Sequence, residues 1–328
     1  MKGSMEALAE LLEPIAPGLE RMRTLLAAQV RENSPAVSDM TDHVARFQGK
    51  QLRGALVLLT GEATGNTTDE HAAVAAIVEM IHLATLVHDD ILDGAEVRRR
   101  VACVNQRWDN QVAVLLGDFL YARAFALSTQ LSSRLCSRLL AETTRTLCVG
   151  EIEQSTRRYD FEMSQATYEA IASAKTASLY GAACELGARY PGGNEVIGAR
   201  MGEAGKNLGL AFQIVDDCLD LTAREEELGK SVGTDVEDGK ITLPVLLAYR
   251  AAAERTRAAI RDAYTRPGVA DRRAALLSVC DVSAGVEEGQ ERARRLLERA
   301  LALLSELPPS RALSAMQRLF HFVLARNQ

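Results

Sequence analysis

Apolar residues recur at helical spacing along most of the chain, and three segments are apolar on nearly every side. The clearest is 72–92, interrupted chiefly by Glu79, His82 and a group of aspartates at its end. Segments 112–131 and 201–221 have the same character. A helix that is apolar all round is normally buried. The pattern therefore predicts three buried helices inside a shell of amphipathic ones.

Glycines and prolines mark the expected helix ends, and the segments between them suit helices of about 10 to 25 residues. Alternating β-branched runs are scarce. We therefore expect an all-α protein in which residues 1–328 form a single large helical bundle, with the polar stretch 223–240 as a long loop. The residues that predict helix ends are Pro35, Gly61, Gly65, Gly150, Pro191 to Gly193, Gly229, Gly233, Pro267, Gly268, Pro308 and Pro309.

Composition narrows the function classes. The formal net charge of the 328 residues is −6, so nothing draws the whole chain toward nucleic acid or an anionic membrane surface. Six scattered cysteines without a Cys-x-x-Cys pair favour reduced thiols and a cytoplasmic protein. The start of the chain lacks the pattern of a signal peptide, and no stretch of about 20 residues is free of charge. We therefore expect no membrane span.

Two acidic clusters carry the chemistry. Each has the form Asp-Asp-x-x-Asp and closes an apolar helical run: Asp89, Asp90 and Asp93 in the first, Asp216, Asp217 and Asp220 in the second. Positions four apart share a helix face, so the first and last aspartate of each cluster can meet one ion. Carboxylate oxygens suit Mg²⁺ or Mn²⁺. A solvated helix end is the ordinary alternative for one cluster, but two copies after core-like helices favour a metal site.

Basic residues gather around the same elements. Any one of them alone is an ordinary surface charge. Together with Mg²⁺ and carboxylates, arginine and lysine form a clamp for a diphosphate group. The set consists of Lys50 and Arg53, Arg98 to Arg100 after the first aspartate cluster, Lys175, and the pair Lys230 and Lys240 around the long loop.

At this point the sequence resembles the trans-polyprenyl diphosphate synthases, over nearly its whole length. Five motifs occur in the family's order: Glu79-Met80-Ile81-His82 leading to His88-Asp89-Asp90-Ile91-Leu92-Asp93 and Arg98-Arg99; Lys175-Thr176; Phe212-Gln213-Ile214-Val215-Asp216-Asp217; Gly229-Lys230 through Gly233-Thr234-Asp235; and Gly239-Lys240-Ile241-Thr242-Leu243-Pro244. The resemblance implies an all-α bundle of the isoprenoid synthase type around a central apolar cavity, usually a homodimer.

The resemblance also implies a role for each site residue. Three aspartates would bind Mg²⁺, three ions per active site, supported by the other three: Asp89, Asp93 and Asp216, with Asp90, Asp217 and Asp220. Three cations would contact the allylic diphosphate: Arg98, Lys175 and Lys230. Four residues would bind the diphosphate of isopentenyl diphosphate: Lys50, Arg53, His82 and Arg99. The reacting centre would be lined by Thr176, Gln213 and Lys240.

Two places depart from the family pattern. The usual Gly-Gly-Lys-Arg-x-Arg-Pro is here Gln48-Gly49-Lys50-Gln51-Leu52-Arg53-Gly54, which keeps both cations and loses the proline. We expect a looser turn there and a weaker isopentenyl diphosphate site. The glycine that usually follows the arginine pair is Arg100, which changes the loop or adds a phosphate contact.

The implied reaction is a head-to-tail trans condensation of isopentenyl diphosphate with an allylic diphosphate. Ionisation places charge on the leaving diphosphate, where Mg²⁺ and the cations stabilise it, and no side chain is an obvious general base. One helical turn before the first aspartates lie the small residues Ala84 and Thr85, where farnesyl-making relatives usually carry aromatic residues. We therefore predict a product longer than C20, with Phe119 or Phe125 as a candidate floor for the tunnel, although ordinary core packing explains each equally well.

Other functions stay open. A short-chain farnesyl or geranylgeranyl diphosphate synthase differs only in product length. A class I terpene cyclase usually has an Asn/Ser/Glu second motif and needs no isopentenyl diphosphate site, so Lys50, Arg53, His82 and Arg99 argue against it. A regulatory subunit of a heteromeric synthase usually lacks the aspartates, all six of which are present here.

Overall fold

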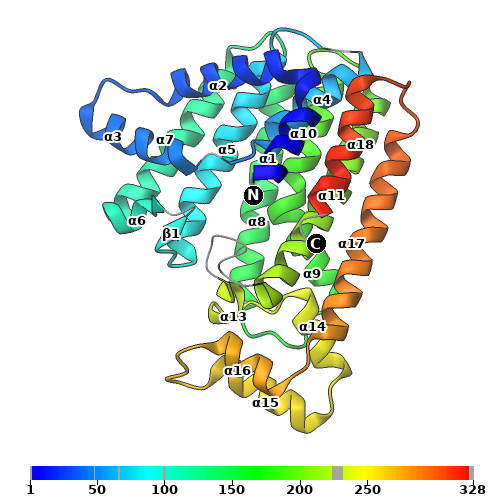
Figure 1. Ribbon diagram of the computed structural model, residues 1–328. Coiled ribbons are helices and arrows are strands. Elements are labelled where there is room, and N and C mark those ends of the chain that lie inside the picture. The colour runs from blue at the N-terminus through cyan, green and yellow to red at the C-terminus, as the bar shows by residue number, and fades with distance from the viewer. Residues whose placement is uncertain (1, 48, 66, 99–100, 224–231, 325–328) are drawn as a thin grey trace.

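The computed structural model describes residues 2–47, 49–65, 67–98, 101–223 and 232–324. Long helices run side by side as a bundle, and a smaller helical hairpin lies across its lower end (Figure 1). The helices are α1 (Lys2–Leu11), α2 (Ala16–Val30), α3 (Pro35–Val44), α4 (Leu52–Thr64), α5 (His71–Leu92), α6 (Val104–Arg107), α7 (Asn110–Thr129), α8 (Leu135–Thr156), α9 (Gln165–Ala172), α10 (Ser178–Arg189), α11 (Glu195–Thr222), α13 (Thr234–Glu237), α14 (Leu243–Ala251), α15 (Glu254–Thr265), α16 (Arg272–Val279), α17 (Ser283–Leu304) and α18 (Arg311–Leu324).

Short elements join the long helices. Two 3₁₀ turns, η1 (Glu13–Ile15) and η2 (Ala45–Phe47), follow α1 and α3, and a π-helical turn η3 (Ser173–Ala177) joins α9 to α10. The strands β1 (Val97–Arg98) and β2 (Val101–Ala102) form a small antiparallel hairpin after α5, with Val97 opposite Ala102. The predicted all-α fold class is confirmed.

Two of the three predicted buried helices form the centre of the bundle. α5 packs against α4 and α7, and α11 packs against α10 and α17. The apolar side of α5 includes Ala76, Ile77, Met80 and Ile81, all fully buried. α11 belongs to both groups of buried hydrophobic residues: its first half shares one group with α10, against which it packs, and its second half shares the other with α14 and α17. The two aspartate clusters thus end the two helices that the core holds most firmly.

The third predicted buried helix, α7, is only partly covered. Its Leu115 is 60% exposed and Val114 is 42% exposed. By length and composition alone, α5 and α7 could each cross a membrane, but 78% of the apolar window of α5 is buried inside the bundle, against 39% for α7. α5 is therefore a core helix, and α7 carries an apolar face that the described part of the chain does not cover.

Two predicted boundaries are wrong. Gly150 was expected to end a helix and instead lies inside α8. A Cβ there would lie 2.8 Å from both the Ala174 Cβ and the Lys175 backbone nitrogen, so the glycine allows η3 to approach α8 closely. The predicted loop 223–240 contains the short helix α13, although residues 224–231 lie outside the described residues.

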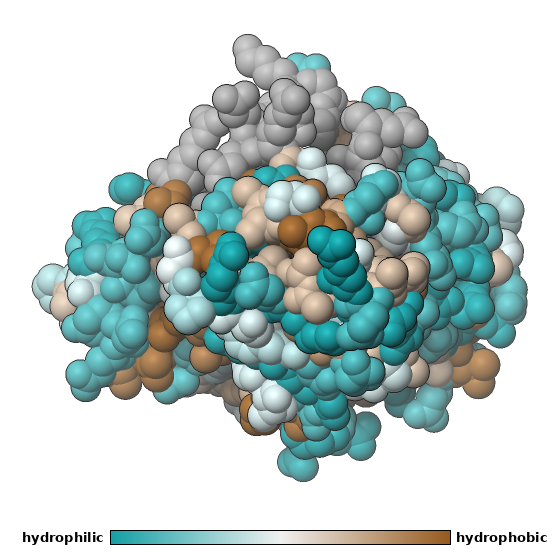
Figure 2. Space-filling model, turned by 90° about the horizontal axis from the view of Figure 1, so that it is seen from below, coloured by the Kyte–Doolittle hydropathy of each residue, from teal (hydrophilic) through white to brown (hydrophobic). Residues whose placement is uncertain are grey.

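The end of the molecule that carries α15 and α16 is largely hydrophilic, with hydrophobic residues gathered near the middle of the face (Figure 2). The long, strongly amphipathic α17 closes one side of the bundle, with Leu296 and Ala300 turned into the core (Figure 1). The C-terminal ends of α5 and α11 lie near α8, α9 and α13, and the candidate site lies there.

Candidate active site

In the first aspartate cluster, Asp90 forms a buried ion pair within the protein. Asp90 is 1% exposed and pairs with Arg98 of β1, whose Nη2 and Nε lie 2.6 and 2.8 Å from the same Asp90 oxygen. The Asn105 side chain also donates to the Asp90 backbone carbonyl. Asp90 therefore anchors the hairpin to the end of α5. Arg98, which was predicted to contact the allylic diphosphate, is occupied by this pair, with 28% of its side chain exposed.

The ionised form of Asp89 is disfavoured by its surroundings. Burial raises the pKa of its carboxyl to about 6, and the nearby negative charges of Glu151 and Asp93 add to the shift. The Lys175 ammonium acts in the opposite direction and does not cancel it. A desolvated carboxylate near two others is a group that a divalent cation would stabilise strongly.

In the second cluster, two aspartates are engaged by the protein itself. Asp217 accepts hydrogen bonds from the Tyr168 hydroxyl at 2.5 Å and from the Gln213 amide at 2.7 Å. Asp220 accepts from the backbone N–H groups of Gly233 and Asp235, which begin α13. Asp217 and Asp220 therefore help to hold α9 and the start of α13 against the end of α11.

Lys175 reaches the site from the π-helical turn η3. Its Nζ lies 2.6 Å from a Glu151 oxygen and 2.9 Å from the Gln154 side-chain oxygen. Burial alone would lower the pKa of Lys175, but the negative charges of Asp89 and Glu151 outweigh it and the pKa is raised. A π-helical turn changes the direction in which successive side chains point. Lys175 is thus held protonated close to Asp89.

The neighbouring Thr176 belongs to the second cluster instead. Its hydroxyl donates to the Gln213 side-chain oxygen at 2.7 Å, and Gln213 in turn donates to Asp217. A small enclosed pocket of about 30 Å³ is lined by five predicted site residues, Lys175, Thr176, Gln213, Asp217 and Lys240. The structure therefore brings these five residues together from three separate parts of the sequence.

Lys240 connects the first aspartate cluster to the segment that follows α11. Its Nζ donates to Asp93 at 2.8 Å and to Asp238 at 3.0 Å, and lies 3.8 Å from Asp235. The side chain is 8% exposed. Burial alone would lower the pKa of Lys240, but the negative charges of the three carboxylates outweigh this effect and raise it. Lys240 therefore stays protonated and joins α5 to the segment after α11.

The residues predicted to bind isopentenyl diphosphate lie on α4, α5 and the turn before α4. The Lys50 ammonium lies 4.6 Å from the centre of the Phe322 ring, and the Arg53 guanidinium lies 4.4 Å from the centre of the Tyr180 ring. The Arg53 Nε is buried without a hydrogen-bond partner among the described residues. His82 is partly exposed on α5. Arg99, Lys230, Gln48 and Arg100 lie outside the described residues.

The sequence reasoning missed several residues that complete the site. Glu151 and Gln154 hold Lys175, Tyr168 holds Asp217, and Asp235 and Asp238 hold Lys240. Glu151 and Gln154 had a usable signal, since polar residues three apart share a helix face. Tyr168 had none, because only the packing of α9 on α11 brings it to Asp217.

Within the described part of the chain, no three His, Cys, Asp or Glu side chains converge closely enough to hold a metal by themselves. Mg²⁺ usually binds one or two carboxylates and completes its shell with water and substrate phosphate. Asp89 and Asp93, at one helix end, and Asp216, at the other, fit this kind of site better than a closed protein cage.

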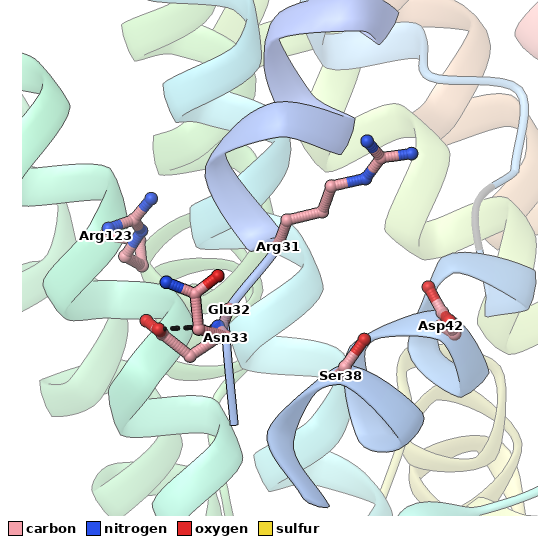
Figure 3. A pocket seen from close by; sticks show the side chains of 6 residues that line it. All are labelled: Arg31, Glu32, Asn33, Ser38, Asp42 and Arg123. Atoms are coloured by element: carbon pink, nitrogen blue, oxygen red, sulfur yellow. Dashed lines mark hydrogen bonds between the residues drawn. The ribbon is translucent and has the colours of Figure 1, made fainter. Parts of the chain in front are cut away.

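A wide surface depression lies away from these residues. It encloses about 580 Å³ and is lined by Arg31, Glu32, Asn33, Ser38, Asp42 and Arg123, at the end of α2, on α3 and on α7 (Figure 3). Its side chains are polar and separated, and none of the predicted site residues lines it. The candidate site is therefore defined by its converging charges and not by this depression.

Comparison with known proteins agrees with this geometry. A sequence model described as polyprenyl synthetase matches residues 34–277. The octaprenyl diphosphate synthase of Haemophilus influenzae is 31% identical over 99% of both chains, and heptaprenyl diphosphate synthase component 2 of Bacillus subtilis is 33% identical over 92% of this chain and 86% of that one. A polyprenyl synthase structure from Caulobacter crescentus, complexed with calcium and isoprenyl diphosphate, superposes with a TM-score of 0.90 at 32% identity over 98% of both chains. The chain belongs to the polyprenyl synthetase family and is a trans-prenyltransferase.

Proposed function

We propose that this enzyme condenses isopentenyl diphosphate with an allylic diphosphate and extends the chain beyond C20. The carrying observation is that two cations meet the first aspartate cluster, with Lys240 bound to Asp93 and Lys175 next to Asp89, and that both line one pocket with Asp217 of the second cluster. That arrangement places fixed positive charge beside carboxylates that suit Mg²⁺. The names of the octaprenyl and heptaprenyl synthases among the relatives support a long product.

Asp89, Asp93 and Asp216 would hold the metal, by family likeness three Mg²⁺ ions, with Mn²⁺ as a possible substitute. When bound, the ions supply Lewis-acid stabilisation of the leaving diphosphate. Lys175, fixed by Glu151 and Gln154, adds positive charge that needs no rearrangement as the carbon–oxygen bond breaks. Arg98 and Lys230 would add to this charge, with Arg98 first released from Asp90.

The second substrate would bind around Lys50, Arg53, His82 and Arg99. Arg53 offers a buried Nε that is without a partner among the described residues, the kind of donor a diphosphate oxygen satisfies. The hydroxyl of Thr176 and the amide of Gln213 would line the reacting centre, and the fixed network of Asp217 keeps both oriented. Apolar walls would keep water from the allylic cation.

The function is tested by incubating purified protein with Mg²⁺, isopentenyl diphosphate and geranyl, farnesyl or geranylgeranyl diphosphate, with products separated by mass. We expect Mg²⁺-dependent products longer than C20. Products that stop at C15 or C20 would replace the long-chain proposal by a short-chain one. Lack of turnover with every primer would contradict the proposed function.

The product length is expected to depend on the turn of α5 before the aspartates. Ala84 is fully buried, and the Thr85 hydroxyl donates to the His82 carbonyl at 2.7 Å. Ala84→Phe and Thr85→Phe should each shorten the main product by at least one C5 unit, because an aromatic ring would block the tunnel. Mass spectrometry of the products checks this, with thermal melting to show that the variants fold. Unchanged products from two folded variants would remove both residues from the length ruler.

We also propose that the protein is a homodimer that uses the exposed face of α7. An exposed apolar helix face of this kind marks an interaction surface. Leu115→Asp should convert the dimer to a monomer, because burying an unpaired charge costs about 3–5 kcal/mol. Light scattering after gel filtration checks the mass, and Val196→Asp, at a 67% exposed position on α11, is the control.

A wild-type monomer would contradict the homodimer. A chain that becomes active only with a second protein would make it a component of a heteromeric synthase, as the name of the Bacillus subtilis relative suggests for that protein. An unchanged mass for the Leu115→Asp variant would move the interface away from α7.

We further propose that residues 1–328 act as one polyprenyl synthase domain in the cytoplasm. The passage of α11 through both groups of buried residues supports a single domain. All six cysteines are unpaired, which suits a reducing compartment.

A further inference from the structure

The start of α4 has an unusual anchor. The backbone N–H of Gly54 donates to the Glu79 Oε1 of α5 at 2.7 Å, and the contact is buried. Gly54 is the third residue of α4, and the N–H groups of a first helical turn have no acceptor within their own helix. A carboxylate is a strong acceptor there, because it also meets the positive end of the helix dipole. Glu79 therefore caps α4 from a neighbouring helix.

This contact depends on a departure from the family pattern. The usual proline at position 54 has no N–H and could not donate to Glu79. A Cβ at this position would lie 2.4 Å from the Met22 sulfur and 3.1 Å from the Glu79 Cγ, so a proline ring has no room unless Met22 moves. Gly54 thus supplies Glu79 with an N–H that the usual proline lacks, and Met22 fills the space beside it.

The segment between the two cations needs such an anchor. Gln51 has a φ of 50°, in the left-handed region that non-glycine residues seldom occupy. Its side-chain oxygen accepts from the Arg23 Nε of α2 at 2.8 Å. A conformation of this kind persists only where surrounding contacts hold it. Arg23 holds the segment at Gln51, and Glu79 holds it at Gly54, just after Arg53.

Glu79 also lies where it can fix the start of α4 relative to His82 on α5. His82 follows it by three residues on α5, so both residues lie on one side of that helix. Lys50 lies just before α4, and Arg53 lies in its first turn, directly before Gly54. A fixed Glu79–Gly54 contact therefore fixes the position of these two cations relative to His82.

We propose that Glu79 is a positioning residue for isopentenyl diphosphate, which holds Lys50 and Arg53 in place through the Gly54 N–H; this inference rests on the proposed function. The turn that lacks the family's proline is therefore not loose, contrary to the sequence-based expectation. Glu79 acts through the backbone of α4.

Two substitutions separate the hydrogen bond from the charge. Glu79→Asp keeps the charge but shortens the side chain by one methylene group, so it should lose the contact and raise the KM for isopentenyl diphosphate about tenfold. Glu79→Gln keeps the length and an acceptor oxygen, so its KM should stay within about twofold of wild type. The KM for farnesyl diphosphate should not change in either variant.

Glu70→Asp is the matched control. Glu70 precedes α5 and also accepts a backbone N–H, from Ser132 at 2.9 Å, but it lies on the other end of the helix from the site. Its variant should lower thermal stability without altering either KM. Amide exchange of the 51–56 segment gives a readout independent of activity, with faster exchange expected in Glu79→Asp and wild-type exchange in Glu79→Gln.

The outcomes are distinct. A wild-type KM for isopentenyl diphosphate in folded Glu79→Asp would overturn the inference, as would a tenfold rise in Glu79→Gln, because the charge would then be the cause. Lys50→Ala tests the site itself. If it raises the KM while Glu79→Asp does not, only the inference fails. If Lys50→Ala has no effect, the proposed isopentenyl diphosphate site fails.

Discussion

Replacing Asp89 by Asn is expected to lower kcat by about 10³-fold and, at the same time, to stabilise the metal-free protein at neutral pH. The loss of activity follows from the loss of a metal-binding carboxylate, since the Lewis-acid contribution of a bound metal is worth several kcal/mol. The gain in stability follows from the cost of keeping Asp89 ionised where burial, Glu151 and Asp93 oppose its charge.

The contribution of Asp89 to the stability of the folded protein depends on pH. The pKa of Asp89 is about 6 in the folded protein, against 3.8 for an unperturbed carboxyl. Between these values the folded state binds the proton more tightly, so the contribution of Asp89 to stability falls as the pH rises from about 4 to 6. Above pH 6 its cost is fully present. Asn removes that cost, so the melting temperature should rise by about 3 °C at pH 7.5 and not at pH 4.

Thermal melting in EDTA at both pH values checks the effect, with Asp69→Asn as the control because the Asp69 side chain is 97% exposed. Mg²⁺ with a diphosphate should raise the melting temperature of the wild type more than that of Asp89→Asn. A destabilised Asp89→Asn at pH 7.5 would contradict the electrostatic argument, and a kcat within tenfold of wild type would remove Asp89 from the metal site.

Replacing Lys175 by Ala is expected to lower kcat by about 10²- to 10³-fold, because a fixed positive charge beside the leaving diphosphate is lost. The substitution also leaves the buried Glu151 without its partner at 2.6 Å. The carboxylates of Glu151 and Asp89 would then repel each other without Lys175 between them. A lower melting temperature should accompany the loss of activity.

Steady-state kinetics with both substrates saturating checks this, with Glu151→Gln as the matched variant. Glu151→Gln keeps the Lys175 charge and should lose much less activity. Lys175→Arg should recover activity only in part, because the pocket around it measures only about 30 Å³. An active Lys175→Ala variant, or equal losses in Lys175→Ala and Glu151→Gln, would assign Lys175 a structural role.

Much of the fold could be predicted from the sequence, because helices and their ends depend on residues that are close together in the chain. Helical periodicity, together with Pro191 to Gly193 and Pro308 to Pro309, indicated helices that α10, α11, α17 and α18 confirm. Two of the three departures from the prediction have tertiary causes. Gly150 does not end α8, because its role is to admit η3, and α7 keeps an exposed apolar face that periodicity alone could not distinguish from a buried one.

The sequence by itself determined the family and the all-α class and predicted the chemical nature of the site, because two Asp-Asp-x-x-Asp repeats on apolar helices and their accompanying cations are local patterns. Only the tertiary structure decided which of these charges meet. It paired Asp90 with Arg98, engaged Asp217 with Tyr168, joined Asp93 to Lys240, and anchored Gly54 on Glu79. The physical reason is that the interaction energy and the pKa of a buried charged group depend on its nearest partner and on its exclusion from water. The packing of the helices sets both.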